Sequence, residues 1–215
     1  MPRPRSLTPA QLADAALAVL DRDNLPGLTM RAVGAELGTS TMALYRYVAD
    51  RDELEALVVE RVLDGVDMRP PTDVPWPDGI RALVDRVRVA VGAHPAVVPL
   101  LPAHRHRSPG ILRWGEAALA VLTRAGFAGT RRVVAFRALL AYVVGAIQME
   151  HLGGLGGPGT AVIAALPREE FPLLAETARA AAAVGPDDEF GGGLDLLLDG
   201  LARQLARRPS GPGDR

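Results

Sequence analysis

The side chains best suited to chemistry lie in residues 28–51, LTMRAVGAELGTSTMALYRYVADR. Leu44 and Val48, four residues apart, would bury one face of a helix in the second half of this stretch. The opposite face would carry Thr41, Met42, Tyr45, Arg46 and Tyr47. Such a face is what the second helix of a helix-turn-helix presents to the major groove of DNA.

Two short helices joined by a tight turn would position this face. Thr29 is the expected N-cap of the first helix, and Leu28 and Val33 are spaced for a hydrophobic staple across its start. Gly38 should end that helix in the left-handed conformation, and Ser40 is the expected N-cap of the second helix. The apolar side of the first helix consists of Leu28, Met30, Val33 and Leu37.

A longer helix should precede this pair. Thr8, Pro9 and Gln11 form a strong helix start, because threonine caps, proline suits the first turn and glutamine can return a hydrogen bond to the cap. The helix should stop near Asp23, before a turn at residues 24–27.

A linker helix should follow the pair, from about Arg51 to Val66, with Asp50 and Glu53 as a capping box. The proline-rich residues 68–77 would then form a hinge.

The stretch also resembles the DNA-binding domain of the tetracycline-repressor (TetR-type) family of bacterial transcription regulators. The residues that carry the resemblance are Leu28-Thr29-Met30-Arg31, Leu37-Gly38-Thr39-Ser40, Ala43-Leu44-Tyr45-Arg46-Tyr47-Val48 and Arg51-Asp52-Glu53-Leu54. The family usually has lysine at position 51 and often histidine at position 47, and Arg51 and Tyr47 both keep a donor suited to phosphate. The resemblance implies an all-α protein: an N-terminal three-helix helix-turn-helix domain joined by a linker helix to a larger helical ligand-binding and dimerisation domain. The expected domains are residues 1–66 and 67–215.

The resemblance also assigns roles to individual residues. Arg31 takes a base-reading position, where an arginine can bond guanine O6 and N7. Base-facing positions fall to Thr41, Met42 and Ala43, and phosphate-facing positions to Thr29, Tyr45, Tyr47 and Arg51. Arg46 could serve either purpose, and Ser40 completes the expected DNA-binding set. The alternative for all of them is a solvated polar face.

Composition fits a cytoplasmic protein. The 215 residues are 48% apolar, enough for a core, and include no cysteine, which excludes disulfides and suits a reducing compartment. The N-terminus lacks a signal-peptide core, and its Arg3 and Arg5 could reach a minor groove or form a solvated tail. The formal net charge of −1 does not by itself indicate a nucleic-acid binder.

The rest of the chain shows helical periodicity and no convincing alternation of period two. Helices are expected at residues 80–93, 111–125, 130–152, 167–184 and 189–206, a short helix or turn at 96–101, a loop at 104–110 and a flexible glycine segment at 153–159. Glu169 and Glu170 would favour the start of the fourth of these helices. The apolar run from Val133 to Met149 is interrupted by Arg137 and Gln148, so we expect a buried helix and not a membrane span.

Two helices are too apolar for the surface of a monomer. One carries Val133, Phe136, Leu139, Leu140, Val143, Val144 and Ile147, and the other Leu194, Leu197, Leu198, Leu201 and Leu205. Doubled by a two-fold axis they would form a four-helix interface, and the resemblance implies the same homodimer. The glycines at 191–193 should let the start of the last helix fray.

A drug-sized apolar pocket with a few polar groups is the expected site for a small-molecule effector. Its candidate residues are Val91, Leu101, His104, Trp114, Phe136, Arg137, Tyr142, Gln148 and His151; each apolar one could equally be plain core. Tetracycline repressors bind a drug–magnesium complex partly through a histidine, and His104, His106 and Glu150 lie near the corresponding positions. We predict no metal site and no cofactor, with magnesium in a ligand complex as the alternative.

Catalysis is not indicated. Residues 154–159 match the letters of a dinucleotide fingerprint, but they follow a helix and no strand, and Pro158 lacks the N–H that a phosphate cradle needs. No nucleophile has a nearby base. The expected function is a TetR-type repressor that binds operator DNA as a homodimer and is released by a small molecule. The alternatives are an all-helical small-molecule-binding protein or enzyme without a regulatory role, and a TetR-type activator.

Overall fold

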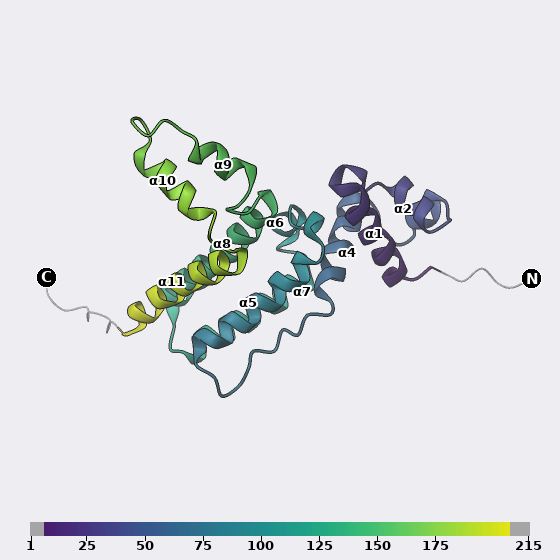
Figure 1. Ribbon diagram of the computed structural model, residues 1–215. Coiled ribbons are helices and arrows are strands. Elements are labelled where there is room, and N and C mark those ends of the chain that lie inside the picture. The colour runs from purple at the N-terminus through teal and green to yellow at the C-terminus, as the bar shows by residue number, and fades with distance from the viewer. Residues whose placement is uncertain (1–6, 207–215) are drawn as a thin grey trace, which may run out of the picture. The chain divides into compact units, whose positions relative to one another are not determined.

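A computed structural model describes residues 7–206. These residues form α-helices, one short 3-10 helix and connecting turns, with no strand between residues 7 and 206 (Figure 1). The elements are α1 (Pro9–Gly27), α2 (Met30–Glu36), α3 (Thr41–Leu44), α4 (Arg51–Leu63), α5 (Trp76–Gly92), η1 (Pro95–Val97), α6 (Leu100–His104), α7 (Pro109–Arg124), α8 (Gly129–Leu152), α9 (Pro158–Ala164), α10 (Pro172–Ala181) and α11 (Pro186–Ala206). The all-α prediction is confirmed. Arg3 and Arg5 lie outside the described residues.

The described residues divide into two compact units. The first holds the residues up to Asp73 together with Ala82–Ala118, and the second holds Val74–Arg81 and the residues from Leu119 onward. α5 and α7 therefore each contribute to both units. This division follows packing and does not test the predicted boundary after residue 66, which stays a prediction.

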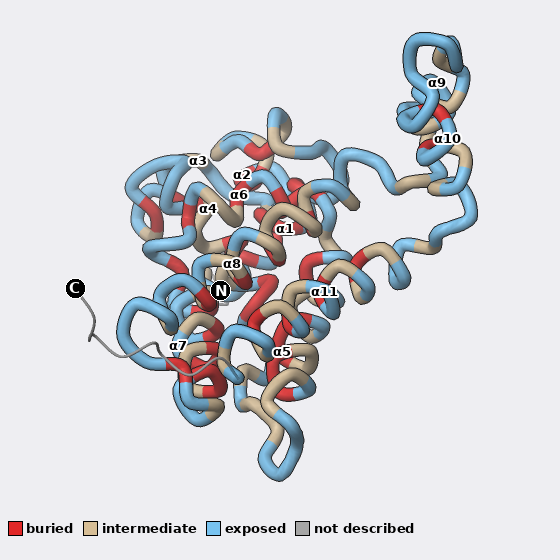
Figure 2. Tube along the Cα trace, turned by 90° about the vertical axis from the view of Figure 1, so that its left-hand side faces the viewer, coloured by how far each residue is buried: buried red, intermediate tan, exposed pale blue. Residues whose placement is uncertain are grey.

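α1 begins as predicted. The Thr8 hydroxyl accepts a hydrogen bond from the Gln11 N–H at 3.2 Å, and the Gln11 side chain accepts one from the Thr8 N–H at 3.0 Å. Buried and exposed positions recur along the helix (Figure 2), and Leu12, Ala16, Val19 and Leu20 are buried. Asn24, with φ of 58°, interrupts the helical conformation, so the regular helix stops at Asp23 as expected.

α4 starts at Arg51 as predicted, but only half of the expected capping box forms. The Asp50 carboxylate accepts from the Glu53 N–H at 2.9 Å. The Glu53 carboxylate reaches one residue further back than the cap and accepts from the Ala49 N–H at 2.6 Å. The helix ends at Leu63, three residues before the predicted end at Val66.

α5 starts four residues earlier than predicted, at Trp76 instead of Ile80. The prediction assigned Pro77 to the hinge. Proline fits the first turn of a helix because the N–H it lacks has no partner there in any case. The expected loop at residues 104–110 is also shorter, since α6 extends to His104 and α7 begins at Pro109.

α9 and α10 differ most from the prediction. The glycine segment ends at Gly157, and Pro158 begins a helix that the sequence reading missed. α10 starts at Pro172 and not at residue 167, because proline disfavours the helical conformation in the residue before it, and Phe171 lies at φ −126° and ψ 57°. Glu169 and Glu170 therefore precede the helix start that they were expected to favour. The two helices pack chiefly on each other, and Figure 2 draws them mostly as exposed.

α8 and α11 form the core of the second unit. Leu139, Val143 and Ile147 of α8 and Leu194, Leu198 and Leu201 of α11 are buried. The Tyr142 hydroxyl donates to the Phe190 carbonyl, and the two rings lie 5.7 Å apart. Gly193 allows this approach, because a Cβ there would lie 2.5 Å from the Tyr142 hydroxyl oxygen. α11 runs without interruption across the three glycines, so the predicted fraying is not seen.

α8 is less buried than expected. Among residues 7–206 it is the one helix long and apolar enough to cross a membrane, with a mean hydropathy of 1.5 over 18 residues of which 22% are buried. The expectation that it falls short of a membrane span was wrong by this measure, because Arg137 is a single charge among mostly apolar side chains. Length and composition are weak support for a membrane span, since core helices share them. Val133, Val134, Met149 and Leu152 are exposed on α8, as is Leu196 on α11.

Candidate nucleic-acid interface

The turn between α2 and α3 has the geometry of a helix-turn-helix. The Thr29 hydroxyl caps α2 by accepting from the Ala32 N–H at 3.1 Å. Gly38 takes the left-handed conformation at φ 62°, as predicted. The Thr39 N–H then bonds back to the Gly34 carbonyl at 2.8 Å, which closes the turn.

Gly34 is a residue of this turn that sequence reasoning missed. It is buried, and a Cβ at this position would lie 3.0 Å from the Thr39 carbonyl oxygen and 3.8 Å from the Leu44 side chain. Glycine therefore lets α2 pack closely against the turn and α3. The signal was a glycine within a helical pattern next to the turn, whose meaning depends on what packs against it.

α3 is short, and its cap differs from the prediction. Ser40 occupies the N-cap position, but its side chain makes no capping hydrogen bond. The regular helix covers only Thr41–Leu44, and the Tyr47 and Val48 N–H groups continue the turn by bonding to the Leu44 carbonyl. The predicted buried pair is confirmed: Leu44 and Val48 are both in the core.

The predicted reading face points away from that core. It consists of Thr41, Met42, Tyr45, Arg46 and Tyr47. Met42 is 73% exposed and Tyr45 is 50% exposed, large values for side chains of this size. Arg46 is also exposed, whereas Thr41, Ala43 and Tyr47 are half-buried. Exposed apolar and aromatic groups beside an arginine suit the edges and backbone of DNA better than they suit water.

Arg31 and Arg46 are the cations most open to a DNA backbone or base. Both are exposed, and within residues 7–206 neither side chain has a hydrogen bond or an ion pair. Arg22, by contrast, is paired with Asp23 and Glu36. Two unpaired arginines per chain give the helix-turn-helix a small positive surface on a chain whose formal net charge is −1.

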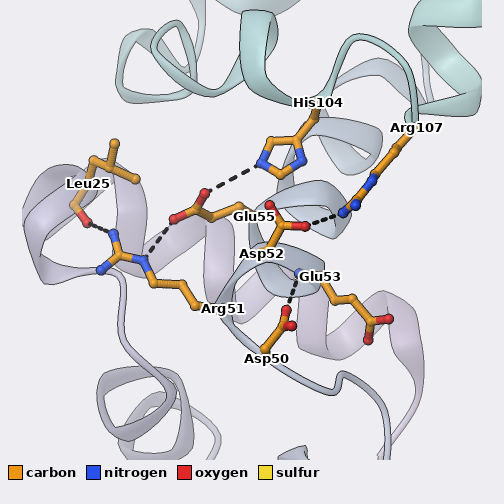
Figure 3. Close-up of polar contacts among 8 residues, drawn as sticks. All are labelled: Leu25, Asp50, Arg51, Asp52, Glu53, Glu55, His104 and Arg107. Atoms are coloured by element: carbon orange, nitrogen blue, oxygen red, sulfur yellow. Dashed lines mark hydrogen bonds and ion pairs between the residues drawn. The ribbon is translucent and has the colours of Figure 1, made fainter.

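Arg51, expected to contact phosphate, is held by partners within the chain (Figure 3). Its Nε donates to Glu55 Oε1 at 2.7 Å, and its Nη2 donates to the Leu25 carbonyl at 2.8 Å. The other carboxylate oxygen of Glu55 lies 3.4 Å from Nε2 of His104 on α6. Arg107 pairs with Asp52 beside this group.

Glu60 of α4 also makes hydrogen bonds to the start of α7. Its carboxylate accepts from the Ser108 hydroxyl, the Gly110 N–H and the Arg113 guanidinium, each at 2.7 Å. Burial acts to raise the pKa of Glu60, but the hydrogen bonds from Gly110, Ser108 and Arg113 outweigh it and hold the pKa below its ordinary value. The N-terminus of α7 is thus capped by an acid from another helix.

The candidate ligand-binding residues are divided between the two units. Val91, His104 and Trp114 are buried in the first unit and Leu101 is half-buried there. In the second unit Phe136, Tyr142 and Gln148 are half-buried, and Arg137 and His151 are exposed. The Trp114 indole N–H donates to the Leu83 carbonyl at 3.1 Å, so this side chain already has a structural role. The pocket as a whole stays a prediction.

The histidines do not assemble a metal site in the described part of the chain. Residues 7–206 contain no group of three or more histidine, cysteine or acidic side chains placed to hold an ion. His104 is 1% exposed, and its Nδ1 has no hydrogen-bond partner among those residues. His106 is exposed.

Taken together, the closed turn, the buried Leu44–Val48 pair and the exposed reading face define a helix-turn-helix regulator with a helical body. The sequence model of a family described as "Tetracyclin repressor-like, C-terminal domain" matches residues 70–205. The chain belongs to the tetracycline repressor-like family of transcriptional regulators.

Known proteins agree with this assignment over nearly the whole chain. The HTH-type transcriptional repressor DrrR1 of Streptomyces coeruleorubidus is 30% identical over 96% of this chain and 81% of its own length. The class A tetracycline repressor from transposon 1721 of Escherichia coli is 28% identical over 96% of both chains. A solved possible TetR family regulator from Streptomyces coelicolor is 28% identical, with a TM-score of 0.82 over 92% of this chain and all of the other.

Proposed function

We propose that the protein is a transcriptional repressor that binds operator DNA as a homodimer and is released by a small molecule. The observation that carries this proposal is the exposed face of α3 and its following turn, backed by the buried Leu44 and Val48. Met42 and Ala43 would touch base edges, and Arg31 would read a base from the start of α2. Tyr45, Tyr47 and the Thr29 hydroxyl would contact phosphates.

A second copy of the chain accounts for the exposed apolar side of the second unit. Val133, Met149 and Leu152 on α8 and Leu196 on α11 are open to solvent. A membrane would accept the same helix by hydropathy, but α11 carries Asp195 and Asp199 on exposed positions beside it. A two-fold four-helix contact between copies buries the apolar side chains and leaves those acids at its rim. Two copies would place their recognition helices at half-sites about one DNA turn apart.

A small molecule bound in the helical body would release the DNA. The likeness to a tetracycline repressor supports an effector of drug size. The effector must bind the two states of the protein unequally, since only a difference in affinity shifts the equilibrium between them. Among the candidates, Phe136, Tyr142 and Gln148 of the second unit would supply its contacts, with no metal and no cofactor.

We further propose that the chain is not an enzyme and acts in the cytoplasm. The family to which it belongs consists of transcriptional regulators. An activator has the same physical parts and differs in where its operator lies relative to the promoter. Names of relatives as repressors favour repression.

The test is DNA binding by matched arginine variants. Arg46→Gln removes a cation from the reading face, and Arg168→Gln removes an exposed cation from the segment before α10. Using the DNA upstream of the protein's own gene, or a duplex selected from a random library, Arg46→Gln should weaken binding at least tenfold. Arg168→Gln should leave it within a factor of two. Equal effects of the two variants would contradict the assignment of α3 as the reading element.

A further inference from the structure

We propose that Glu55 is a positioning residue that controls whether Arg51 can reach the DNA backbone, and that His104 on α6 sets how strongly Glu55 holds Arg51. The inference rests on the proposed DNA-binding function and adds a regulatory link between α6 and the recognition helices. It concerns residues that all belong to the first compact unit.

The two oxygens of the Glu55 carboxylate have different partners. Oε1 accepts from Arg51 Nε at 2.7 Å, and Oε2 lies 3.4 Å from His104 Nε2 (Figure 3). One negative charge is therefore shared between an arginine at the start of α4 and a histidine on α6. The Glu55 side chain is only 17% exposed, so water screens this group less than it screens a surface pair.

Arg51 is held in a position that competes with DNA. A guanidinium has five N–H donors, and two of the Arg51 nitrogens already bond to Glu55 and to the Leu25 carbonyl. The side chain remains about half exposed at the edge of the helix-turn-helix. A phosphate that approached it would meet a charge already balanced by Glu55, so the ion pair must weaken before Arg51 contributes fully.

His104 is placed to control that weakening. It is buried, its Nδ1 has no hydrogen-bond partner within residues 7–206, and its Nε2 contacts the Glu55 carboxylate. While His104 donates to Oε2, part of the Glu55 charge is compensated on the α6 side. A displacement of α6 would remove this partner, and Glu55 would then attract Arg51 more strongly and lower the affinity for DNA.

A purely structural role is the competing explanation. The bond from Arg51 to the Leu25 carbonyl also connects the start of α4 to the end of α1. On this explanation Arg51 and Glu55 serve only to fix the turn. The two explanations differ in sign. Loss of the Glu55 charge should strengthen DNA binding if Glu55 restrains Arg51, and should weaken binding or leave it unchanged if the pair only stabilises the fold.

The experiment measures dissociation constants of the full-length chain for one duplex that the wild type binds. Glu55→Gln should tighten binding by about 2- to 30-fold, the range that the loss of one partly exposed ion pair in each chain of a dimer would give. Asp52→Asn is the matched control, because it makes the same charge change on α4 but pairs with Arg107 instead of Arg51. It should change binding less than Glu55→Gln does.

Two further comparisons test the proposed coupling from His104 through Glu55 to Arg51. In an Arg51→Gln background the advantage of Glu55→Gln over Asp52→Asn should disappear, as a double-mutant cycle requires for coupled residues. His104→Leu, or His104→Phe if the first variant melts early, should weaken binding severalfold in the wild-type background and not in the Arg51→Gln background. Thermal melting of each variant shows that a change in binding does not come from unfolding.

The outcomes separate the inference from the function on which it rests. A wild-type chain that binds no duplex would contradict the proposed DNA-binding function. Wild-type binding with equal effects of Glu55→Gln and Asp52→Asn would overturn the coupling of His104, Glu55 and Arg51 and leave the proposed DNA-binding function intact. A Glu55→Gln advantage that persists without Arg51 would also overturn it, since the effect would then be general repulsion of the DNA.

Discussion

Replacing Glu60 by glutamine should separate α4 from the start of α7 and cost more stability than any exposed ion pair in the chain. The Ser108 hydroxyl and the Gly110 N–H both donate to Oε2, and Arg113 donates to Oε1. A glutamine oxygen in the place of Oε2 keeps two neutral hydrogen bonds, but its amide nitrogen faces the Arg113 guanidinium. The variant therefore loses the charge assistance of two bonds and one ion pair.

The magnitude follows from these losses. A hydrogen bond to a charged group contributes about 1.5–3 kcal/mol and a neutral one about 0.5–1.5 kcal/mol, so two converted bonds lose about 2 kcal/mol. The Arg113 pair adds about 0.2–1 kcal/mol, because its guanidinium is half exposed. Glu60→Gln should thus lower the free energy of unfolding by about 2–3 kcal/mol. At about 2–4 °C per kcal/mol for a chain of this length, the melting temperature should fall by roughly 4–12 °C.

Low pH should remove the difference in stability between the wild type and Glu60→Gln. Because the pKa of Glu60 is held below its ordinary value of 4.5, the carboxylate stabilises the fold at pH values above that value. The contribution is lost as the pH falls through the lowered pKa, where the folded protein takes up the proton. Melting curves of wild type and Glu60→Gln at fixed protein concentration should differ fully at pH 7 and converge in acid, as the pH falls through the lowered pKa of Glu60.

The control is Arg113→Gln, which removes the ion pair and leaves the bonds from Ser108 and Gly110 in place. It should cost no more than about 1 kcal/mol. The reasoning would be refuted if Glu60→Gln melted with the wild type at pH 7, if both variants cost the same, or if the Glu60→Gln difference grew as the pH fell.

Three other predictions concern packing, capping and charge. Gly193→Ala should destabilise the second unit by about 1–3 kcal/mol, since its Cβ would lie 2.5 Å from the Tyr142 hydroxyl oxygen, and Tyr142→Phe should recover part of that loss in melting experiments. Thr8→Ala should lower the free energy of unfolding by about 1 kcal/mol through loss of the α1 cap, whereas Thr8→Ser should not, as urea titration would show. The affinity for operator DNA should fall with salt at a log–log slope near −4 for a dimer, about −0.9 for each phosphate met by Arg46 and Arg51; a slope near −10 would mean that many more cations take part.

Local patterns predicted much of the fold. Thr8, Pro9 and Gln11 specify a helix start by contacts within one turn, and Leu44 and Val48 specify a buried face by spacing alone. The left-handed Gly38 follows from the same short-range chemistry. These features depend on neighbours in sequence, so the sequence displays them directly.

Other features depend on what packs from afar or on competing local signals. The partners of Glu60 lie about fifty residues away, and the link from Arg51 through Glu55 to His104 crosses the same interval. Gly34 shows its importance only when the Thr39 carbonyl is placed against it. α9 was missed because Gly157 and Pro158 indicate both a loop and a helix start, and only the structure decides between them.

The central claim is that α3 reads DNA from a two-fold dimer, and a selection from a random duplex library tests it most directly. We expect the full-length chain at low salt to enrich sequences with two inverted half-sites whose centres lie about one helical turn apart. The most enriched sequence should be bound by two chains per duplex. Failure to enrich any sequence, or enrichment of a single half-site bound by one chain, would contradict the account.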